Sequence, residues 1–256
     1  MPATRQPLSV AIITLNAAAQ LDACLQSVRF ADEIVVVDSG STDGTPALAE
    51  RFGARVIQQD WLGFGPQKQF AVEQARHDWV LCLDADERVT PELQAGIENV
   101  LKSPSTAAFR CARRNRFLGR YLKHGEGYPD WSLRLFDRRQ ARWSDDAVHE
   151  KVETQSRIGE VSGDLLHDSA ESLATYLTKQ NRYTTLAADT AFAAGKRASF
   201  GRVAFSPLVR FIKFYLVRQG FRDGLPGLIH IAIGCFNSFM KYSKMLERQN
   251  SDATPR

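Results

Sequence analysis

Short apolar runs alternate with amphipathic segments along residues 1–104. Each run is rich in branched residues and bounded by turn formers, which is typical of a buried strand. Strands are therefore predicted at residues 9–15, 33–37, 54–58 and 79–83. Apolar residues at helical spacing predict intervening helices at 45–52, 66–75 and 91–101, and an earlier one through Leu21, Cys24, Leu25 and Val28. This alternation indicates an α/β fold with a mostly parallel sheet and right-handed crossovers.

Helix-end signals support two of these predictions. Thr90 precedes Pro91, so that a capping hydroxyl is followed by a proline at the first helical position. Gly53 follows the helix predicted at 45–52, where a residue with positive φ commonly ends a helix. The helix at 91–101 is therefore expected to begin directly after Thr90, and the helix at 45–52 to end before Gly53.

Carboxylates follow two of the predicted strands directly. Asp38 ends the run at 33–37, and Asp84 and Asp86 end the run at 79–83. In an open α/β sheet, ligands bind where the carboxyl ends of the strands emerge. An Asp-x-Asp pair is common in surface turns, but its place directly after buried residues favours a site. Two such oxygens suit Mg²⁺ or Mn²⁺ with water and a diphosphate, so the sequence predicts a nucleotide-sugar site.

The loop after the first strand excludes several other nucleotide-binding classes. Residues 14–19 read Thr-Leu-Asn-Ala-Ala-Ala and contain no glycine. Rossmann cofactor loops and P-loops need glycine so that the backbone can approach phosphate. A dehydrogenase, a P-loop enzyme and a sugar-nucleotide pyrophosphorylase are therefore disfavoured, and a metal is expected to handle the phosphate.

Composition agrees with a cytoplasmic enzyme. The chain has 256 residues, 44% of them hydrophobic, which is enough for one sizeable core and an appendage. Its four cysteines form no Cys-x-x-Cys pair, and Cys24 and Cys82 fall at apolar positions, so we expect reduced core thiols. No secretory signal and no apolar run long enough to span a bilayer are recognised.

Several motifs in order resemble family 2 glycosyltransferases of the GT-A fold. They are Ile12-Ile13-Thr14-Leu15-Asn16, the stretch from Val36 to Thr45, the Gln67-Lys68 pair and Leu83-Asp84-Ala85-Asp86-Glu87. The resemblance implies a UDP-sugar donor and a Mg²⁺ or Mn²⁺ ion held by Asp86. It implies that Asp38 contacts the uracil or ribose and that Asp84 lies near the ribose. The other donor-binding residues that it implies are Thr14, Asn16, Ser39, Ser41, Lys68 and Ala85. The alternative for Lys68 is an exposed lysine on a helix.

The middle third resembles lipopolysaccharide core glycosyltransferases, which add a hexose, often glucose. The resemblance lies in residues 128–136 and 143–150. An inverting transferase needs a carboxylate to deprotonate the acceptor hydroxyl. Asp130, Glu150 and the Asp145-Asp146 pair are candidates, and Glu150 is favoured because its neighbour His149 could add a metal or phosphate ligand. Arg134 alternates with apolar residues and could meet the diphosphate.

The Gln-x-x-Arg-Trp signature of processive synthases is absent, and so are their spanning helices. The enzyme is therefore expected to transfer one hexose and release the product. The acceptor is expected to be a lipopolysaccharide core or a related lipid-linked saccharide.

The C-terminal region has a different composition. Residues 190–222 contain no acidic side chain, and basic and aromatic residues are interleaved along them. After Pro207 a helix is predicted with an apolar face of Leu208, Phe211, Ile212, Tyr215 and Leu216. Arg210, Lys213 and Arg218 lie on the opposite face. This pattern predicts a helix at an anionic membrane interface on the cytoplasmic side, where each basic residue contributes about 1 kcal/mol. The alternative is a packed helix with a solvated basic face. A net charge of only +4 and the lack of a recognised motif disfavour nucleic acid.

Three segments are therefore predicted. Residues 1–104 form the nucleotide-sugar-binding half, residues 105–168 the acceptor and catalytic half of the same GT-A domain, and residues 169–256 a helical extension. A catalytically idle GT-A-like module that tethers other proteins to a membrane is the alternative to an enzyme, and the retained aspartates argue for the enzyme.

Overall fold

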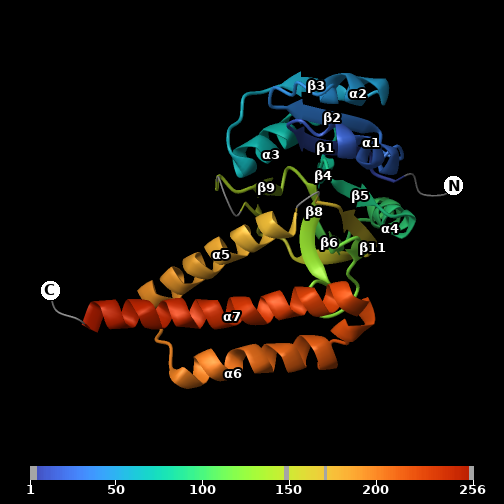
Figure 1. Ribbon diagram of the computed structural model, residues 1–256. Helices are drawn as coiled ribbons and strands as arrows, with labels where there is room; N and C mark the ends of the chain where they lie inside the picture. The colour runs from blue at the N-terminus through green and yellow to red at the C-terminus, as the bar shows by residue number, and fades with distance from the viewer. Residues whose placement is uncertain (1–4, 147–149, 170–171, 254–256) are drawn as a thin grey trace. The chain divides into compact units, whose positions relative to one another are not determined.

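The computed structural model of the chain describes residues 5–146, 150–169 and 172–253 and divides into two compact units (Figure 1). The first unit comprises residues 1–113 and 130–168, and the second comprises residues 114–129 and 169–256. The structure thus groups residues 114–129 with the C-terminal helices, whereas the sequence places them in the acceptor half.

Four parallel strands form one side of the sheet in the first unit. They lie in the order β3 (Arg55–Gln58), β2 (Glu33–Asp38), β1 (Leu8–Thr14) and β4 (Trp79–Asp84). Asp38 pairs with Thr14 in the β1–β2 register, and Asp84 pairs with Ile13 in the β1–β4 register. The polar ends of three strands therefore meet at one edge, as the sequence predicts.

Antiparallel pairing extends the sheet beyond β4. The order continues through β8 (Asp130–Asp137), β6 (Ala108–Phe117), β11 (Ile158–His167) and β5 (Glu87–Val89). β8 pairs antiparallel with β4 and with β6, and β11 pairs antiparallel with β5. A separate ribbon joins β9 (Ala141–Trp143) to β10 (Val152–Thr154). These long-range pairings bring residues from the second half of the chain to the strand ends of the first half.

Helices cover both faces of this sheet. The alternating side chains of the strands divide the core into two clusters, because successive residues of a strand point to opposite faces. Val10, Ile12 and Val36 belong to the cluster that includes α1 (Ala18–Ser27), α2 (Thr45–Arg51) and α4 (Pro91–Lys102). Ala11, Val35 and Val37 belong to the cluster that includes α3 (Phe64–Glu73) and Trp143. The central strands are thus buried on both faces, which explains their continuous apolar sequence.

The predicted elements agree closely with the observed ones. Thr90 caps α4, its hydroxyl accepting a hydrogen bond from Leu93 N at 3.2 Å. Gly53 follows α2 with a φ of +78°, a conformation that glycine adopts at no steric cost. In the first unit the largest shift is in α3, which begins at Phe64 rather than at Pro66.

Long helices dominate the second unit. It contains α5 (Leu173–Ala193), α6 (Phe200–Phe211) and α7 (Gly224–Ala253), and α7 packs against both of the others. A π-helical turn η1 (Ile212–Val217) follows α6, a 3₁₀ turn η2 (Gly220–Asp223) precedes α7, and the short strand β7 (Arg120–Tyr121) pairs with the end of β6. The helix predicted to start after Pro207 begins at Phe200 instead, because Ser199 caps it by accepting from Arg202 N at 3.4 Å.

Two expectations from composition can be compared with this structure. All four cysteines are free, and Cys24 and Cys82 are buried, as predicted. Among the helices that the structure describes, we find none with the length and apolarity needed to traverse a bilayer.

Candidate active site

A cavity of about 670 Å³ lies at the carboxyl ends of β1 and β4 in the first unit. We call it the strand-end cavity. Its polar lining residues are Thr14, Asn16, Gln20, Lys68, Asp84, Asp86, Glu150 and His167, and its other lining residues are Ile13, Leu15, Ala17, Trp61, Phe64 and Ala85. Of the residues predicted to bind the donor, this cavity thus brings together Thr14, Asn16, Lys68, Asp84 and Ala85.

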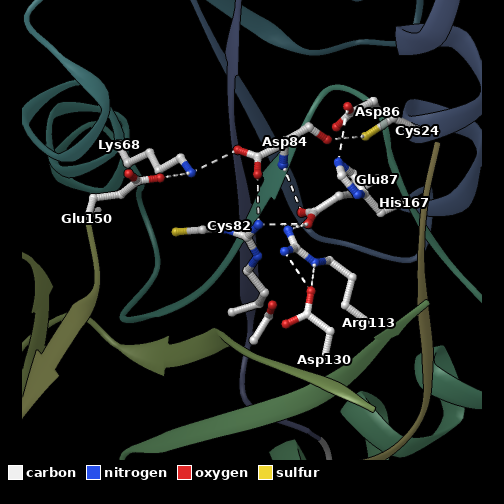
Figure 2. Close-up of polar contacts among 12 residues, drawn as sticks. Cys24, Lys68, Cys82, Asp84, Asp86, Glu87, Arg113, Asp130, Glu150 and His167 are labelled. Atoms are coloured by element: carbon white, nitrogen blue, oxygen red, sulfur yellow. Dashed lines mark hydrogen bonds and ion pairs between the residues drawn. The ribbon is translucent and has the colours of Figure 1, made fainter. Parts of the chain in front are cut away.

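Asp84 lies between two cations (Figure 2). Its Oδ1 is 3.0 Å from Lys68 Nζ, and its Oδ2 is 2.7 Å from Arg134 Nη2. Burial opposes the ionised carboxylate, but the charges and hydrogen bonds of Arg134 and Lys68 outweigh it and hold the pKa of Asp84 well below its usual value. Asp84 is therefore ionised at neutral pH and fixed in direction.

Lys68 links Asp84 to Glu150. Its Nζ is 2.8 Å from Glu150 Oε1 and lies over the ring of Trp143, 4.9 Å from the centroid. The side chain is 8% exposed, so the alternative of an exposed helix lysine is excluded. This contact brings the Glu150 carboxylate to the strand-end cavity.

Asp86 faces a histidine that the sequence analysis did not identify. Asp86 Oδ2 is 3.3 Å from Nε2 of His167, the last residue of β11. The backbone carbonyl oxygen of Asp86 accepts a hydrogen bond from the backbone N–H of Asp168 at 3.0 Å. Pairing of β11 with β5 sets His167 opposite Glu87, so the strand register fixes this meeting. His149, the predicted metal ligand, lies outside the described residues.

A glycine lets β11 lie close to α4. Gly163 has a φ of +102°, and a Cβ there would come within 2.2 Å of the backbone nitrogen of Leu93. A larger residue would therefore move β11 away from the start of α4 and shift His167 relative to Asp86.

The oxygen and nitrogen donors of Asp86 and His167 fit a divalent ion with few protein ligands. Within the described ranges no group of three or more His, Cys, Asp and Glu side chains is arranged to hold a metal. Magnesium commonly takes one or two protein ligands and fills its other positions with water and substrate phosphates. Asp86 and His167 face each other within the cavity and match that pattern.

Glu87 is a buried acceptor that connects Asp84 to two arginines. Its side chain is 0% exposed and accepts hydrogen bonds from Asp84 N at 3.0 Å and from Arg134 Nη2 at 2.7 Å. Arg113 Nη1 lies 3.2 Å from the same Oε1 that accepts from Arg134. Because Arg134 is buried against Asp84 and Glu87 and does not line the strand-end cavity, we interpret it as a positioning residue for Asp84.

Asp38 is buried and holds the ends of β1 and β2 together. Its Oδ1 accepts from the backbone of Gly40 at 3.0 Å and Ser41 at 2.8 Å, and its Oδ2 accepts from the hydroxyls of Thr14 at 2.8 Å and Ser41 at 2.5 Å. Burial raises the pKa of Asp38, but these hydrogen bonds outweigh it and lower the pKa overall. Asp38, Ser39 and Ser41 do not line the strand-end cavity in this structure.

Asn16 shapes the loop between β1 and α1. It has a φ of +50°, a conformation for which asparagine is enriched, and its Oδ1 accepts from Thr42 N at 2.9 Å. This bond ties the loop after β1 to the loop after β2, so both loops are held beside the strand-end cavity.

A second cavity of about 500 Å³ shares a wall with the first. We call it the Trp131 cavity. Lys68, Asp84 and Glu150 line both cavities, whereas Asp130 and Trp131 line only the second. Trp131 is 42% exposed and has the Arg110 guanidinium 4.6 Å from its ring centroid. The arrangement therefore offers two adjoining binding spaces with Glu150 between them.

The remaining candidates for a base are placed differently. Asp130 Oδ2 receives two hydrogen bonds from Arg113, from Nε at 2.9 Å and from Nη2 at 2.7 Å. Asp145 pairs with Arg142 in an exposed contact, and neither Asp145 nor Asp146 lines either cavity. The Asp145-Asp146 pair thus lies in a loop that does not line either cavity.

Comparisons with known proteins agree with this geometry. Residues 9–156 match the family model described as glycosyl transferase family 2. The chain is 34% identical to the lipopolysaccharide core biosynthesis glycosyltransferase LpsC of Rhizobium meliloti, over 97% of this chain and 95% of that protein. It is 31% identical to an uncharacterized glycosyltransferase of Rickettsia bellii, over 94% and 86% of the two chains.

A crystal structure of Staphylococcus aureus TarS 1-349 in complex with UDP is similar in fold. It has a TM-score of 0.51 and 14% sequence identity, and the match covers 96% of this chain and 92% of that one. The shared architecture is the GT-A fold predicted from the sequence. The strand-end carboxylates, the family match and the relatives together establish that the chain belongs to the family 2 glycosyltransferases.

Proposed function

We propose that this protein is a metal-dependent, inverting glycosyltransferase that moves one hexose from a UDP-sugar to a lipopolysaccharide core saccharide. The hexose that we propose is glucose. The observation that supports it most directly is the pair of cavities that share the wall of Lys68, Asp84 and Glu150. A transferase must bring two substrates together at one point, and adjoining cavities with a carboxylate between them satisfy that need.

The strand-end cavity would hold the donor. Asp86 and His167 would hold Mg²⁺ or Mn²⁺, which, when bound, stabilises the charge of the departing diphosphate. Thr14, Asn16 and Ala85 line the same cavity and would contact the nucleotide. Asp38, with Ser39 and Ser41, would act chiefly by holding the loops that face the nucleotide, because the oxygens of Asp38 already accept hydrogen bonds from the protein.

Glu150 would act as the general base. It lines both cavities, so it can reach an acceptor hydroxyl in the Trp131 cavity that points at the anomeric carbon of the donor. Lys68 Nζ lies 2.8 Å from Glu150 Oε1 and would hold the Glu150 carboxylate at the wall that the two cavities share. Asp130 is the alternative base, but it lines only the Trp131 cavity and its Oδ2 is held by Arg113.

The acceptor proposal rests on the similarity to LpsC and on the Trp131 cavity. An exposed indole beside the reacting wall provides an apolar face on which a sugar ring can stack. A core saccharide carried on a lipid would bring the enzyme to the inner face of the cytoplasmic membrane, in agreement with the predicted membrane-binding helix.

The helical unit supports membrane binding with a revised apolar face. Phe211 and Tyr215, predicted to face the bilayer, stack on each other with centroids 4.9 Å apart and are only partly exposed. The exposed apolar side chains of α6 and η1 are Phe200, Phe205, Leu208, Val209, Ile212, Leu216 and Val217. Arg210, one of the basic residues predicted to contact anionic lipid, is paired with Glu126. Lys213 is therefore a better candidate for that contact than Arg210.

Transfer by purified protein tests the proposal. With Mn²⁺ and a panel of nucleotide sugars, the wild type should hydrolyse UDP-glucose slowly and transfer glucose to core saccharide with inversion at the anomeric carbon. A panel in which no nucleotide sugar is consumed would favour the alternative, a catalytically idle module that tethers other proteins to a membrane.

Two matched variants test the base. Glu150→Gln should keep donor affinity and lose turnover by about 100-fold or more, as expected for a missing general base. Asp130→Asn should retain most of its turnover. The opposite result would assign the base to Asp130.

A further inference from the structure

The second unit contains an open cavity of about 730 Å³ that has no part in the sugar-transfer site. It lies between the turn that joins β6 to β7 and the start of α7. We call it the Arg120 cavity. Its lining residues are Arg114, Leu118, Gly119, Arg120, Tyr121, Lys123, Asp223, Gly224, Leu225 and Pro226.

The lining of the Arg120 cavity is positively charged. Arg114, Arg120 and Lys123 bring three cations, and the single carboxylate, Asp223, lies 3.6 Å from Arg120 Nε, so the lining residues together keep a positive charge. The Asp223 carboxylate is 1% exposed, and its Oδ2 accepts from the backbone N–H groups of Lys123 at 2.9 Å and His124 at 2.7 Å. Burial raises the pKa of Asp223, but these bonds and the His124 side chain outweigh it and lower the pKa, so the carboxylate acts as an internal anchor of the loop.

The beginning of α7 adds to the positive potential. Gly224 and Leu225 are the first residues of this long helix and line the cavity. The Gly224 N–H already donates to Phe221 O and Pro226 has no N–H, so this helix start contributes mainly through its dipole, which places about half a positive charge at that end. Together with the three basic side chains, this geometry favours an anion with several acceptor oxygens, such as a phosphate.

Large apolar side chains surround the same cavity. Leu118 is 48% exposed and Leu225 is 67% exposed, and both line it. Phe221, which lies in η2 directly before α7, is 49% exposed. Exposed leucine and phenylalanine beside a basic hollow are unfavourable in water but favourable at the boundary between lipid headgroups and acyl chains.

We propose that the Arg120 cavity binds the phosphate of an anionic lipid headgroup, with Leu118 and Leu225 inserted into the membrane beside it. The inference rests on the membrane part of the proposed function and gives it a specific site. A basic helix face attracts any anionic surface through its field alone, whereas a hollow with three cations and a helix start recognises a phosphate group by contact.

Vesicle sedimentation tests the site. The protein is mixed with phosphatidylcholine vesicles with or without phosphatidylglycerol, and the double variant Arg120→Gln/Lys123→Gln is compared with the control Lys179→Gln/Arg182→Gln in α5. The control removes the same charge from exposed positions of the second unit that do not line the cavity. If each lining cation contributes as basic residues near a membrane usually do, the cavity variant should bind roughly 30-fold more weakly, while the control stays close to the wild type.

Equal loss in the two double variants would overturn the proposal, because binding would then depend on the overall field rather than on the cavity. Stabilisation of the wild type by inorganic phosphate, with vesicle binding unchanged in the cavity variant, would also overturn it, since the site would then serve a soluble phosphate. If the double variant does not fold, Lys123→Gln alone, at an exposed side chain, should still weaken binding by several-fold.

Hydrolysis of UDP-sugar separates this inference from the proposed function. Both double variants should hydrolyse the donor at the wild-type rate, since the changed residues lie outside both cavities of the first unit. A wild type that binds anionic vesicles but consumes no donor would contradict the enzyme proposal and leave the lipid site supported.

Discussion

Replacement of Glu87 by glutamine tests how the site is held in place. Glu87 is fully buried and is shared by two arginines, Arg134 at 2.7 Å and Arg113 at 3.2 Å. Glu87→Gln keeps the shape of the side chain but removes its charge. Among the residues that the structure describes, Arg134 then keeps Asp84 as an anionic partner, and Arg113 keeps Asp130.

The expected cost follows from burial. Removing one partner of a buried ion pair typically costs about 3–5 kcal/mol, and here two arginines would each lose one of two carboxylates in a medium of low dielectric. A domain of this size loses about 2–4 °C per kcal/mol, so Glu87→Gln should lower the unfolding temperature by about 6–20 °C. Glu160→Gln is the matched control: its pair with Arg110 is exposed, at 53% and 41%, and should contribute less than about 1 kcal/mol.

Tryptophan fluorescence during urea and thermal unfolding measures this difference in the relevant unit. The four tryptophans, Trp61, Trp79, Trp131 and Trp143, all belong to the first unit, so their signal reports its unfolding alone. Similar midpoints for Glu87→Gln and Glu160→Gln would refute the reasoning, since the buried network would then contribute no more than a surface pair.

Two further predictions concern pH and the acceptor. The pKa of Asp84 is lowered on folding, so its contribution to stability is present above the unfolded value of about 3.9 and is lost as the pH falls toward the folded value. The urea midpoint of the wild type should therefore fall more steeply below about pH 4 than that of Asp84→Asn, and parallel curves would contradict this. Trp131→Ala should raise the KM for core saccharide by about 10-fold or more while UDP-sugar hydrolysis persists. Trp131→Phe should restore much of the affinity, because it keeps an aromatic face. An unchanged KM in Trp131→Ala would exclude stacking on Trp131.

Sequence patterns predicted the parts of the site that depend on local structure. The parallel strands, the Thr90 cap and the meeting of the β2 and β4 ends at one edge of the sheet follow from periodicity and turn chemistry within short segments. The meeting of Lys68 with Asp84 in one cavity was implied by the resemblance to family 2 glycosyltransferases, which rests on short motifs, and not by periodicity.

The missed features depend on pairing between distant segments. His167 reaches Asp86 only because β11 pairs with β5, and Arg134 reaches Glu87 only because β8 pairs with β4. A histidine at the end of a strand was a visible signal, but no local pattern tells which strand lies beside it.

The start of α6 was predicted wrongly for a local reason. The Ser199 cap starts that helix at Phe200, and Pro207 lies within it.

Calorimetric titration of UDP, with and without Mn²⁺, tests the central claim most directly. The account predicts that the wild type binds UDP much more tightly with Mn²⁺, and that Asp86→Ala and His167→Ala each lose this gain while unfolding at the wild-type temperature. Asp86 and His167 would hold the ion, which would supply positive charge to the diphosphate. Equal UDP affinity with and without Mn²⁺, or an undiminished Mn²⁺ effect in Asp86→Ala, would contradict the account.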